Sequence, residues 1–315
     1  MHDQRVLITG GGGFIGSNLA NHLVRRNDVV VVDDCSLGTP ANVDDAVDYD
    51  ATTVLADDLP TDVDVVFHLA ARSSYAMCED EPAHSARVNV EGFVNVVDQA
   101  IADGCESIVY ASTSSVYGSQ SEPTSEEQPV DVDTGYEASK LARERYAEYF
   151  STHYGVDAAG MRLFSVYQGY GGSEAHKGEY ANVVAQFADD VADGRSPVVY
   201  GDGTQTRDFT HVDDVVRGLE LAADCSLDGV YNLGTGERYD FNTVVSLIAD
   251  ELERRVEPTY VPNPIPEAVY VHDTCADASK LRTETGWTPE VDFEEGVRRV
   301  CSQYEPSGLE SPPSE

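Results

Sequence analysis

The chain has 315 residues, of which 20 are Lys or Arg and 57 are Asp or Glu, so its formal net charge is −37 at pH 7. This charge excludes a nucleic-acid binder that is held by phosphate contacts, because a negative field of this size repels polyanions. Hydrophobic residues make up 41% of the chain, and the length predicts one large domain together with a smaller one.

Acidic pairs such as Asp44-Asp45 and Asp189-Asp190 recur along the chain, which has only three lysines. Salt screens the repulsion between such charges, since the Debye length is roughly 3 Å at molar ionic strength. We therefore interpret the acidic surface as that of a salt-adapted, halophilic protein. The alternative is an acidic docking face for a basic partner.

The six cysteines are scattered, without a CxxC spacing or a histidine pair at a zinc interval. This pattern predicts neither a disulfide framework nor a metal site. No apolar run approaches the roughly 20 residues that a membrane helix needs. We expect a cytoplasmic protein that has no membrane partner.

The first half of the chain alternates short apolar runs with helical patterns. Strands are expected at Arg5–Thr9, Val29–Val32, Val65–Leu69 and Ser107–Ala111, and helices at Phe14–Arg26 and Ala83–Ile101. This alternation predicts a parallel sheet that is buried on both faces. The expected fold is α/β, with a Rossmann-type doubly wound sheet and a smaller, interleaved α/β domain.

The pattern is less regular after Met161. The sequence predicts a glycine-rich loop at Gly169–Gly172, helices at Gly178–Asp190 and His211–Ala223, and strands at Val198–Tyr200 and Val230–Leu233. We assign residues 1–165, with part of 205–240, to the large domain and 166–303 to the small one. Residues 304–315 are expected to form a disordered tail, because Pro306–Glu315 is rich in Pro, Ser and Glu.

A glycine triplet, Gly10, Gly13 and Gly16, lies between the first strand and the first helix, in TGGGGFIGS. Glycine lets the backbone turn sharply and approach a pyrophosphate at the positive end of a helix dipole. Asp33 ends the second strand, near the spacing of about 20 residues at which a carboxylate meets the adenosine ribose. It would repel a 2′-phosphate, so NAD is favoured over NADP. The alternative is that an acid stands there by chance in an Asp-rich chain.

Tyr136 and Lys140, in YEASK, are one helical turn apart and therefore share a helix face. A neighbouring ammonium, together with the nicotinamide ring, would lower the phenol pKa and make Tyr136 a usable general base. The hydroxyl-rich stretch Ala111–Gly118 follows a predicted strand, where ligands bind in open α/β sheets. The competing interpretation is a packed tyrosine beside a solvated lysine.

Taken together, TGGGGFIGS, VVDD, FHLAA, STSSVYG, YEASK and YGDGTQTRDFTHVDD resemble the extended short-chain dehydrogenase/reductase family over roughly residues 5–300. The resemblance is to its NAD-dependent sugar-nucleotide epimerases and dehydratases, of the UDP-glucose 4-epimerase type. It implies that the large domain binds NAD and that the small one binds a nucleotide-diphosphate sugar, most simply a UDP-sugar.

The resemblance also implies roles for individual residues. The catalytic residues would be Thr113, Tyr136 and Lys140. The cofactor would be bound by Gly10, Gly13, Phe14, Ile15, Gly16, Asp33, Asp57, Asp58, Leu69, Ala70, Ala71, Asn89, Tyr136 and Lys140. The substrate would be bound by Thr113, Ser114, Ser165, Asn182, Val183, Tyr200 and Arg207. No metal is implied.

The chain departs from the family at several positions. Dehydratases carry an Asp-Glu pair directly after the catalytic threonine, and decarboxylases carry a glutamate just before Val-Tyr-Gly, whereas Ser114 and Ser115 occupy these positions here. Serine cannot supply the acid and base that elimination of water requires. Ser165 stands where relatives have an asparagine, and His176 and Lys177, in an unusual loop, either supply positive charge to the diphosphate or are simply exposed.

These departures favour an NAD-dependent 4-epimerase. Tyr136, helped by Thr113, would take the proton of the sugar C4 hydroxyl, and a transient 4-keto sugar would turn and be reduced on its other face. The alternatives are a nucleotide-sugar dehydrogenase or reductase with the same residues, and a non-catalytic NAD-binding regulatory protein. Relatives are commonly homodimers, and Leu141, Tyr146 and Phe150 fit either a dimer face or a core.

Overall fold

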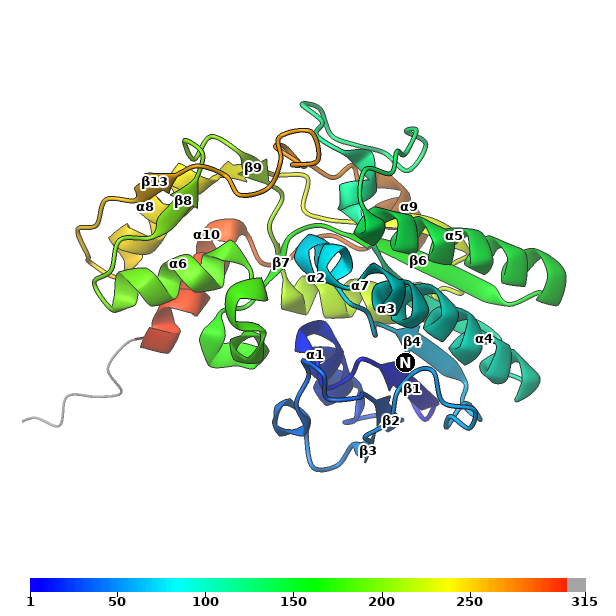
Figure 1. The fold of residues 1–315 in the computed structure, drawn as a ribbon. Coiled ribbons are helices and arrows are strands. Elements are labelled where there is room, and N and C mark those ends of the chain that lie inside the picture. Colours follow the sequence, from blue (N-terminus) through cyan, green and yellow to red (C-terminus); the bar gives the residue numbers. More distant parts are fainter. Residues whose placement is uncertain (305–315) are drawn as a thin grey trace, which may run out of the picture.

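The computed structural model describes residues 1–304, which form a large lobe and a small lobe (Figure 1). A parallel sheet runs through the large lobe, and the small lobe consists of helices and short strand pairs. Of the tail expected at 304–315, residues 305–315 lie outside the described residues, and Tyr304 belongs instead to a helical turn, Ser302–Tyr304.

Seven parallel strands form the large sheet in the order β11-β6-β5-β4-β1-β2-β3. Their bounds are β1 (Arg5–Thr9), β2 (Asp28–Val32), β3 (Asp48–Asp50), β4 (Val65–His68), β5 (Ser107–Thr113), β6 (Asp157–Leu163) and β11 (Gly229–Leu233). The order reverses between β1 and β4, which leaves a crevice at the carboxyl ends of these strands. The predicted doubly wound α/β fold is confirmed.

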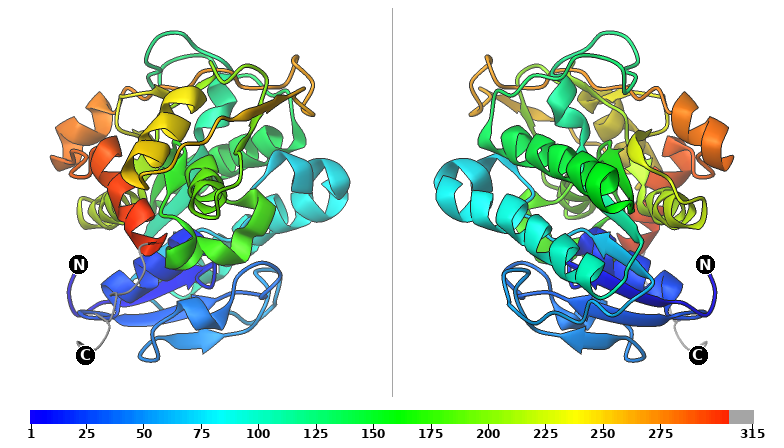
Figure 2. Two further views of the ribbon diagram at one scale, coloured as in Figure 1. Left: turned by 90° about the vertical axis from the view of Figure 1, so that its left-hand side faces the viewer. Right: turned by 90° about the vertical axis from the view of Figure 1, so that its right-hand side faces the viewer.

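Two layers of helices bury the sheet. The first is α1 (Phe14–Leu23) with α7 (Val212–Asp224), and the second is α4 (Gly92–Ala102) with α5 (Gly135–Tyr154). The right-hand view of Figure 2 shows α4 and α5 side by side on their face of the sheet. Because the central strands β1, β2 and β4 are covered on both faces, their runs of apolar residues are nearly continuous.

One predicted helix is broken in the structure. The stretch Ala83–Ile101 forms α3 (Pro82–Ala86), a π-helical turn at Arg87–Glu91 and then α4. Two further helices of the large lobe are α2 (Tyr75–Asp80) and α9 (Ser279–Thr285).

The small lobe packs three helices around an aromatic core. They are α6 (Val183–Ala192), α8 (Phe241–Glu251) and α10 (Phe293–Cys301). Phe209 and Phe293 stack with their ring centres 4.9 Å apart. The short strands are β7 (Val166–Tyr167), β8 (Val198–Tyr200), β9 (Thr206–Arg207), β10 (Thr210–His211), β12 (Tyr239–Asp240) and β13 (Thr259–Val261).

The helix predicted at Gly178–Asp190 begins later, at Val183. Asn182 caps it by accepting the backbone N–H of Val184 at 3.1 Å. Gly178 has a φ of +52°, which is outside the helical range, so the preceding residues form a separate turn.

The chain returns from the small lobe to the large sheet through α7 and β11. Trp287 fixes this return, because its buried indole N–H donates to the Asp214 carbonyl at 3.0 Å. The chain thus enters the small lobe and comes back to the large one, as the predicted interleaving requires. The exact division at 165/166 stays a prediction.

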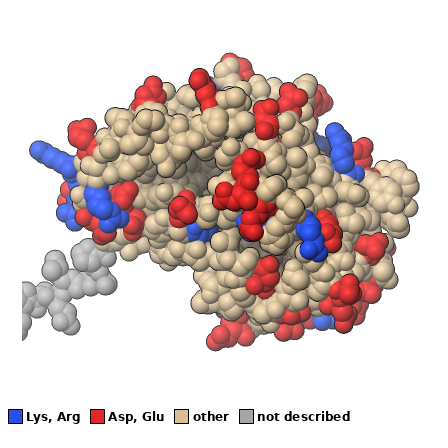
Figure 3. All heavy atoms as spheres, in the orientation of Figure 1, with Lys and Arg blue, Asp and Glu red and all other residues tan. Residues whose placement is uncertain are grey.

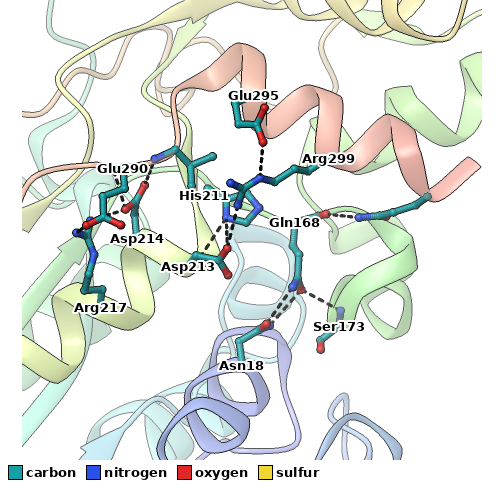
Figure 4. A network of polar contacts seen from close by, with 12 residues as sticks. Asn18, Gln168, Ser173, His211, Asp213, Asp214, Arg217, Glu290, Glu295 and Arg299 are labelled. Atoms are coloured by element: carbon teal, nitrogen blue, oxygen red, sulfur yellow. Dashed lines mark hydrogen bonds and ion pairs between the residues drawn. The ribbon is translucent and has the colours of Figure 1, made fainter. Parts of the chain in front are cut away.

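Polar contacts join the lobes at α1, α7 and α10 (Figure 4). Arg299 of α10 contacts Asp213 of α7 at 3.2 Å, and Asn18 of α1 exchanges two hydrogen bonds with Gln168. The first of these contacts is exposed and contributes little to stability, whereas the paired amides are half-buried.

Of the residues proposed for a dimer face, Phe150 is buried in the core and Leu141 packs partly against Val116 and Phe164. Tyr146 is 42% exposed on α5 and remains available to a partner. The homodimer stays a prediction.

Within the described part of the chain, no helix is both long and apolar enough to cross a membrane. All six cysteines are free thiols, and no cluster of metal-ligating side chains is found among residues 1–304.

Asp and Glu side chains are spread over the visible face of the molecule, and Lys and Arg are fewer (Figure 3). The face is hollowed between the two lobes, and acidic side chains lie close to this hollow. An excess of one charge destabilises the compact state by self-repulsion.

We expect the thermal unfolding temperature to rise as KCl is increased from about 0.1 M to about 1 M, over which the Debye length falls from about 10 Å to about 3 Å. Differential scanning calorimetry checks this. An unchanged or lower unfolding temperature would contradict the salt-adapted interpretation.

Candidate active site

A cavity of about 550 Å³ opens between the lobes at the carboxyl ends of β1, β2, β4 and β5. Its wall includes the glycine turn after β1, the end of β5, the start of α5 and parts of the small lobe. The cavity therefore lies in the crevice where the strand order reverses, which is where open α/β sheets bind ligands.

The glycine turn is closely packed. Gly10 has a φ of +70°, and a Cβ there would lie 2.6 Å from the Ala70 nitrogen. A Cβ on Gly16 would lie 2.2 Å from the Gly10 carbonyl oxygen. Helix α1 starts directly after Gly13, with no side-chain cap on its first N–H groups. These free donors face a space that an anion can enter.

Asp33 is held at the end of β2 by two backbone N–H groups. Gly12 donates to it at 3.0 Å and Cys35 at 2.8 Å. Burial raises the pKa of this carboxyl, and the two hydrogen bonds lower it. The side chain is fixed at the cavity wall with lone pairs left for a diol.

These observations fit a dinucleotide. Glycine at Gly10 and Gly16 allows the turn to pack this closely beside the cavity, the free helix N-terminus suits a pyrophosphate, and Asp33 suits a ribose.

Tyr136 and Lys140 both line the cavity from the first turns of α5. Thr134 and Glu137 form a capping box that fixes the start of this helix. Lys140 is buried, its Nζ donates to the Ala111 carbonyl at 2.9 Å, and it lies 5.7 Å from the centre of the Tyr136 ring. The predicted shared face of the pair is present.

The sequence predicts a lowered pKa for Tyr136, whereas the protein's own groups raise it. Burial raises the pKa of this phenol, while a hydrogen bond with Thr113 and the charge of Arg143 act against the rise. Burial also holds the pKa of Lys140 well below its ordinary value, and Arg143 adds to this effect.

Arg143 lies on the buried face of α5, one turn after Lys140. Its guanidinium donates to the carbonyls of Asn89, at 2.5 Å, and Ala70, at 2.8 Å. Burial lowers its pKa to about 10, so it keeps its charge at neutral pH. Among the described residues no carboxylate pairs with it, and its charge acts on Tyr136 unneutralised.

A buried network fixes the end of β5 against α5. Glu144 of α5 forms an ion pair with Arg162 of β6 at 2.7 Å and accepts the hydroxyl of Ser112 at 2.5 Å. Arg162 also donates to the Tyr117 hydroxyl at 2.7 Å. Thr113, the next residue after Ser112, is thereby set beside Tyr136.

On the small-lobe side, Asn182, Ser165 and Arg207 line the cavity. The Asn182 amide is engaged as the cap of α6 and donates to the Val166 carbonyl at 3.1 Å. Arg207 donates to the Val271 carbonyl at 2.6 Å and contacts the Tyr270 ring at 5.6 Å from its centre.

Most of the residues implied by resemblance line this one cavity. They are Gly10, Gly13, Phe14, Ile15, Gly16, Asp33, Leu69, Ala70, Ala71, Thr113, Ser114, Tyr136, Lys140, Ser165, Asn182 and Arg207.

Five of the implied residues lie elsewhere. Asp57 and Asp58 are exposed beyond the cavity, Tyr200 is 46% exposed on β8, and Val183 follows the cap of α6. Asn89 is buried behind the wall, where it bonds to the Arg72 backbone and the Ser139 hydroxyl.

The sequence did not point to several parts of the wall, among them Arg72 and a segment of the small-lobe side. Arg72 lies in the loop after β4, which ends at His68, and the carboxyl-end rule that drew attention to Ala111–Gly118 applies to this loop equally. Ile265, Val269 and Tyr270 come from a segment without regular structure, in which no periodic pattern could signal a site.

The family model described as "NAD dependent epimerase/dehydratase family" matches residues 6–234. The chain is 34% identical to the UDP-glucose 4-epimerase of Mycolicibacterium smegmatis, over 96% of this chain and 98% of the relative. It is 32% identical to a putative UDP-glucose 4-epimerase of Methanocaldococcus jannaschii, over 94% and 97%. It is 35% identical to an ADP-L-glycero-D-manno-heptose-6-epimerase of Alkalilimnicola ehrlichii, over 93% and 95%.

Solved structures are similar over nearly the whole chain. The UDP-glucose 4-epimerase of Thermotoga maritima with UDP-glucose has a TM-score of 0.89 and 30% identity, covering 95% of this chain and 98% of that one. The UDP-glucose 4-epimerase of Thermus thermophilus in complex with NAD has a TM-score of 0.85 and 30% identity, covering 96% and 100%. The UDP-N-acetylglucosamine 4-epimerase of Methanobrevibacter ruminantium, in complex with UDP-N-acetylmuramic acid, has a TM-score of 0.89 and 28% identity, covering 96% and 99%.

The charge of Arg143 favours the phenolate of Tyr136, so Arg143→Met should raise the Tyr136 pKa and move the pH–rate profile to higher pH. Measuring turnover across neutral and alkaline pH checks this. The matched control is Arg145→Met, which removes an exposed charge from the same helix and should leave the profile in place. A profile that does not move in Arg143→Met would limit this residue to a structural role.

Proposed function

Because the chain belongs to the NAD-dependent epimerase/dehydratase family, we propose that it is a nucleotide-sugar 4-epimerase of the UDP-glucose/UDP-galactose type. The proposal is carried by one observation. Thr113, Tyr136 and Lys140 meet in a cavity whose wall supplies no free acid beside them.

The cofactor is NAD. Gly10, Gly13 and Gly16 would leave space for its pyrophosphate, and Asp33 would accept hydrogen bonds from its adenosine ribose. When bound, NAD supplies a hydride acceptor that can also return the hydride.

The protein's own residues would handle the proton. Tyr136 would take it from the sugar C4 hydroxyl and later return it, and Thr113 would hold that oxygen through its hydroxyl. Lys140, anchored on the Ala111 carbonyl, would fix the face on which Tyr136 works. These groups would move one proton to and from the C4 hydroxyl oxygen.

The carboxylates on the cavity wall are not free to act as an acid or a base on the sugar. Asp33 and Asp34 lie at the end of β2, on the adenosine side. The Glu137 carboxylate accepts the backbone N–H groups of Asp133 and Thr134, at 2.9 and 3.1 Å, as part of the α5 cap. Ser114 and Ser115 follow Thr113, so the described wall offers no acid–base pair for loss of water or carbon dioxide.

A UDP-sugar is the proposed substrate. The Thermotoga maritima structure holds UDP-glucose, and this chain has Arg207 and Asn182 on the small-lobe side of the cavity. A guanidinium binds a diphosphate in bidentate fashion, which supports this placement.

We further propose that the enzyme works in the cytoplasm as a homodimer. Tyr146 and Tyr149, each 42% exposed on α5, support a partner surface there.

A product assay in molar KCl tests the function. The purified protein is incubated without added NAD with UDP-glucose, UDP-galactose, their N-acetylated forms and UDP-glucuronate, and the epimers are resolved. We expect conversion within one pair, because an epimerase regenerates its cofactor in each cycle. Absence of conversion, with NADH appearing once NAD is added, would replace the epimerase by a dehydrogenase.

Tyr136→Phe tests the assignment of the general base. It removes one hydroxyl and should lower kcat by about 10² or more, because a general base typically contributes 10²–10⁴. Bound NAD, measured after denaturation, shows whether the variant keeps its cofactor. Normal turnover in this variant would refute the assignment of Tyr136 as the base.

A further inference from the structure

The segment Gln168–Tyr180, between β7 and α6, leaves the small lobe and lies against α1 of the large lobe (Figure 1). We call this segment the strap. It contains the unusual loop of the sequence, and none of the catalytic steps above uses it.

One end of the strap is fastened to α1. Gln168 Nε2 donates to Asn18 Oδ1 at 2.9 Å, and Asn18 Nδ2 donates to Gln168 Oε1 at 3.1 Å (Figure 4). The backbone N–H of Ser173 also donates to Gln168 Oε1, at 3.0 Å. Because the two amides satisfy each other, this end has a defined position on the second turn of α1.

A buried carboxylate organises the middle of the strap. Glu174 is fully buried and accepts the backbone N–H groups of Gln168, at 2.9 Å, Gly169, at 3.0 Å, and Asn182, at 2.7 Å. Lys177 Nζ lies 3.8 Å from the same carboxylate. Glu174 thereby holds both ends of the strap and sets the position of Lys177.

Lys177 is directed to the glycine turn. Its Nζ lies 5.3 Å from the centre of the ring of Phe14, the first residue of α1, and the side chain lines the cavity with 24% exposure. The other lysine on the wall, Lys140, is engaged with the Ala111 carbonyl at the catalytic end.

His176, the preceding residue, reaches the other side of the same turn. Its Nδ1 lies 3.1 Å from Asn42 Nδ2, and that amide donates to the Gly12 carbonyl at 3.2 Å. His176 and Asp33 are close enough for the charge of each to shift the pKa of the other. The strap thus crosses over the glycine turn from the start of α1 to the ribose carboxylate.

We propose that the strap retains the cofactor, with the Lys177 ammonium as a positive partner of the NAD diphosphate opposite the free N–H groups of α1. The inference rests on NAD as the cofactor and is independent of the 4-epimerase assignment. The nucleotide sugar offers the same diphosphate chemistry, but the contact with Phe14 places Lys177 beside the glycine turn, whereas Asn182 and Arg207 lie on the small-lobe side.

Retention has a consequence for turnover. Release of NAD requires the Gln168–Asn18 and His176–Asn42 contacts to open, so NAD should leave slowly. An enzyme that uses its cofactor and restores it within each cycle gains from this, because no exchange is needed between turnovers.

The test measures NAD directly. Wild type, Lys177→Met, Lys177→Arg and Lys280→Met are purified in molar KCl, and the bound NAD and its release rate are quantified after dilution and after denaturation. Lys177→Met keeps the apolar stem against Phe14 and should release NAD about tenfold faster or more, because hydrogen bonds to charged groups are worth roughly 1.5–3 kcal/mol. Lys177→Arg should restore most of the retention.

Lys280→Met is the matched control, because it removes a lysine that is outside the cavity wall and should leave NAD retention unchanged. Asn18→Ala keeps Lys177 but removes the fastening, so it should also speed release. Thermal unfolding of each variant shows whether the fold is retained.

The UDP dissociation constant of each NAD-loaded variant shows whether Lys177 binds the diphosphate of NAD or that of the nucleotide sugar. Weaker UDP binding with unchanged NAD release in Lys177→Met would assign the lysine to the nucleotide sugar and overturn the proposal. If both stay unchanged, Lys177 only neutralises Glu174, and the proposal is wrong. Faster NAD release supports it, even if the product assay identifies a dehydrogenase.

Discussion

The buried ion pair between Glu144 and Arg162 is the contact on which the geometry of the active site depends. It joins α5, which carries Tyr136 and Lys140, to β6, and through Ser112 it also holds the end of β5, where Thr113 stands. Removing one partner would leave an uncompensated charge in the interior, which typically costs 3–5 kcal/mol. The other donors of Arg162 are also used, on Glu144 and on Tyr117, so the pair specifies a single register between the helix and the sheet. That register places the hydroxyls of Thr113 and Tyr136 side by side.

Several basic residues of this acidic chain lie where an anion would bind. Lys140, Lys177, Arg72 and Arg207 all line the cavity, and Arg143 lies directly behind it. The negative surface around the mouth opposes the entry of an anionic nucleotide, while the basic side chains inside the cavity would favour its binding. Screening by salt would weaken the first effect more than the second, because buried charges are screened less than exposed ones. Salt adaptation and anion binding are therefore compatible in one molecule.

The large lobe fixes the residues of the site, and the strap of the small lobe covers them. The sheet, α1 and α5 fix the glycine turn, Asp33, Tyr136 and Lys140 through buried contacts. The strap reaches the same turn from the small lobe through two amide contacts and one histidine. Such contacts, half-buried and few, open more readily than a packed core. In the proposal above, release of NAD proceeds through the opening of these contacts and leaves the packed core intact.

The sequence by itself determined the doubly wound sheet, the glycine turn, Asp33 and the spacing of Tyr136 and Lys140, because these depend on local periodicity and on neighbours within a few residues. It located β5 correctly but ended it at Ala111, since only pairing with Arg162 and Leu163 of β6 extends the strand to Thr113. Tertiary structure decided where α6 starts, where the helix before α4 is broken, and in which direction the Tyr136 pKa shifts. It also decided which of the implied residues lie outside the cavity wall, namely Asp57, Asp58, Asn89, Val183 and Tyr200. Arg143 and Lys177 show why: the effect of a buried charge depends on burial and on partners far away in the chain, and no local pattern records either.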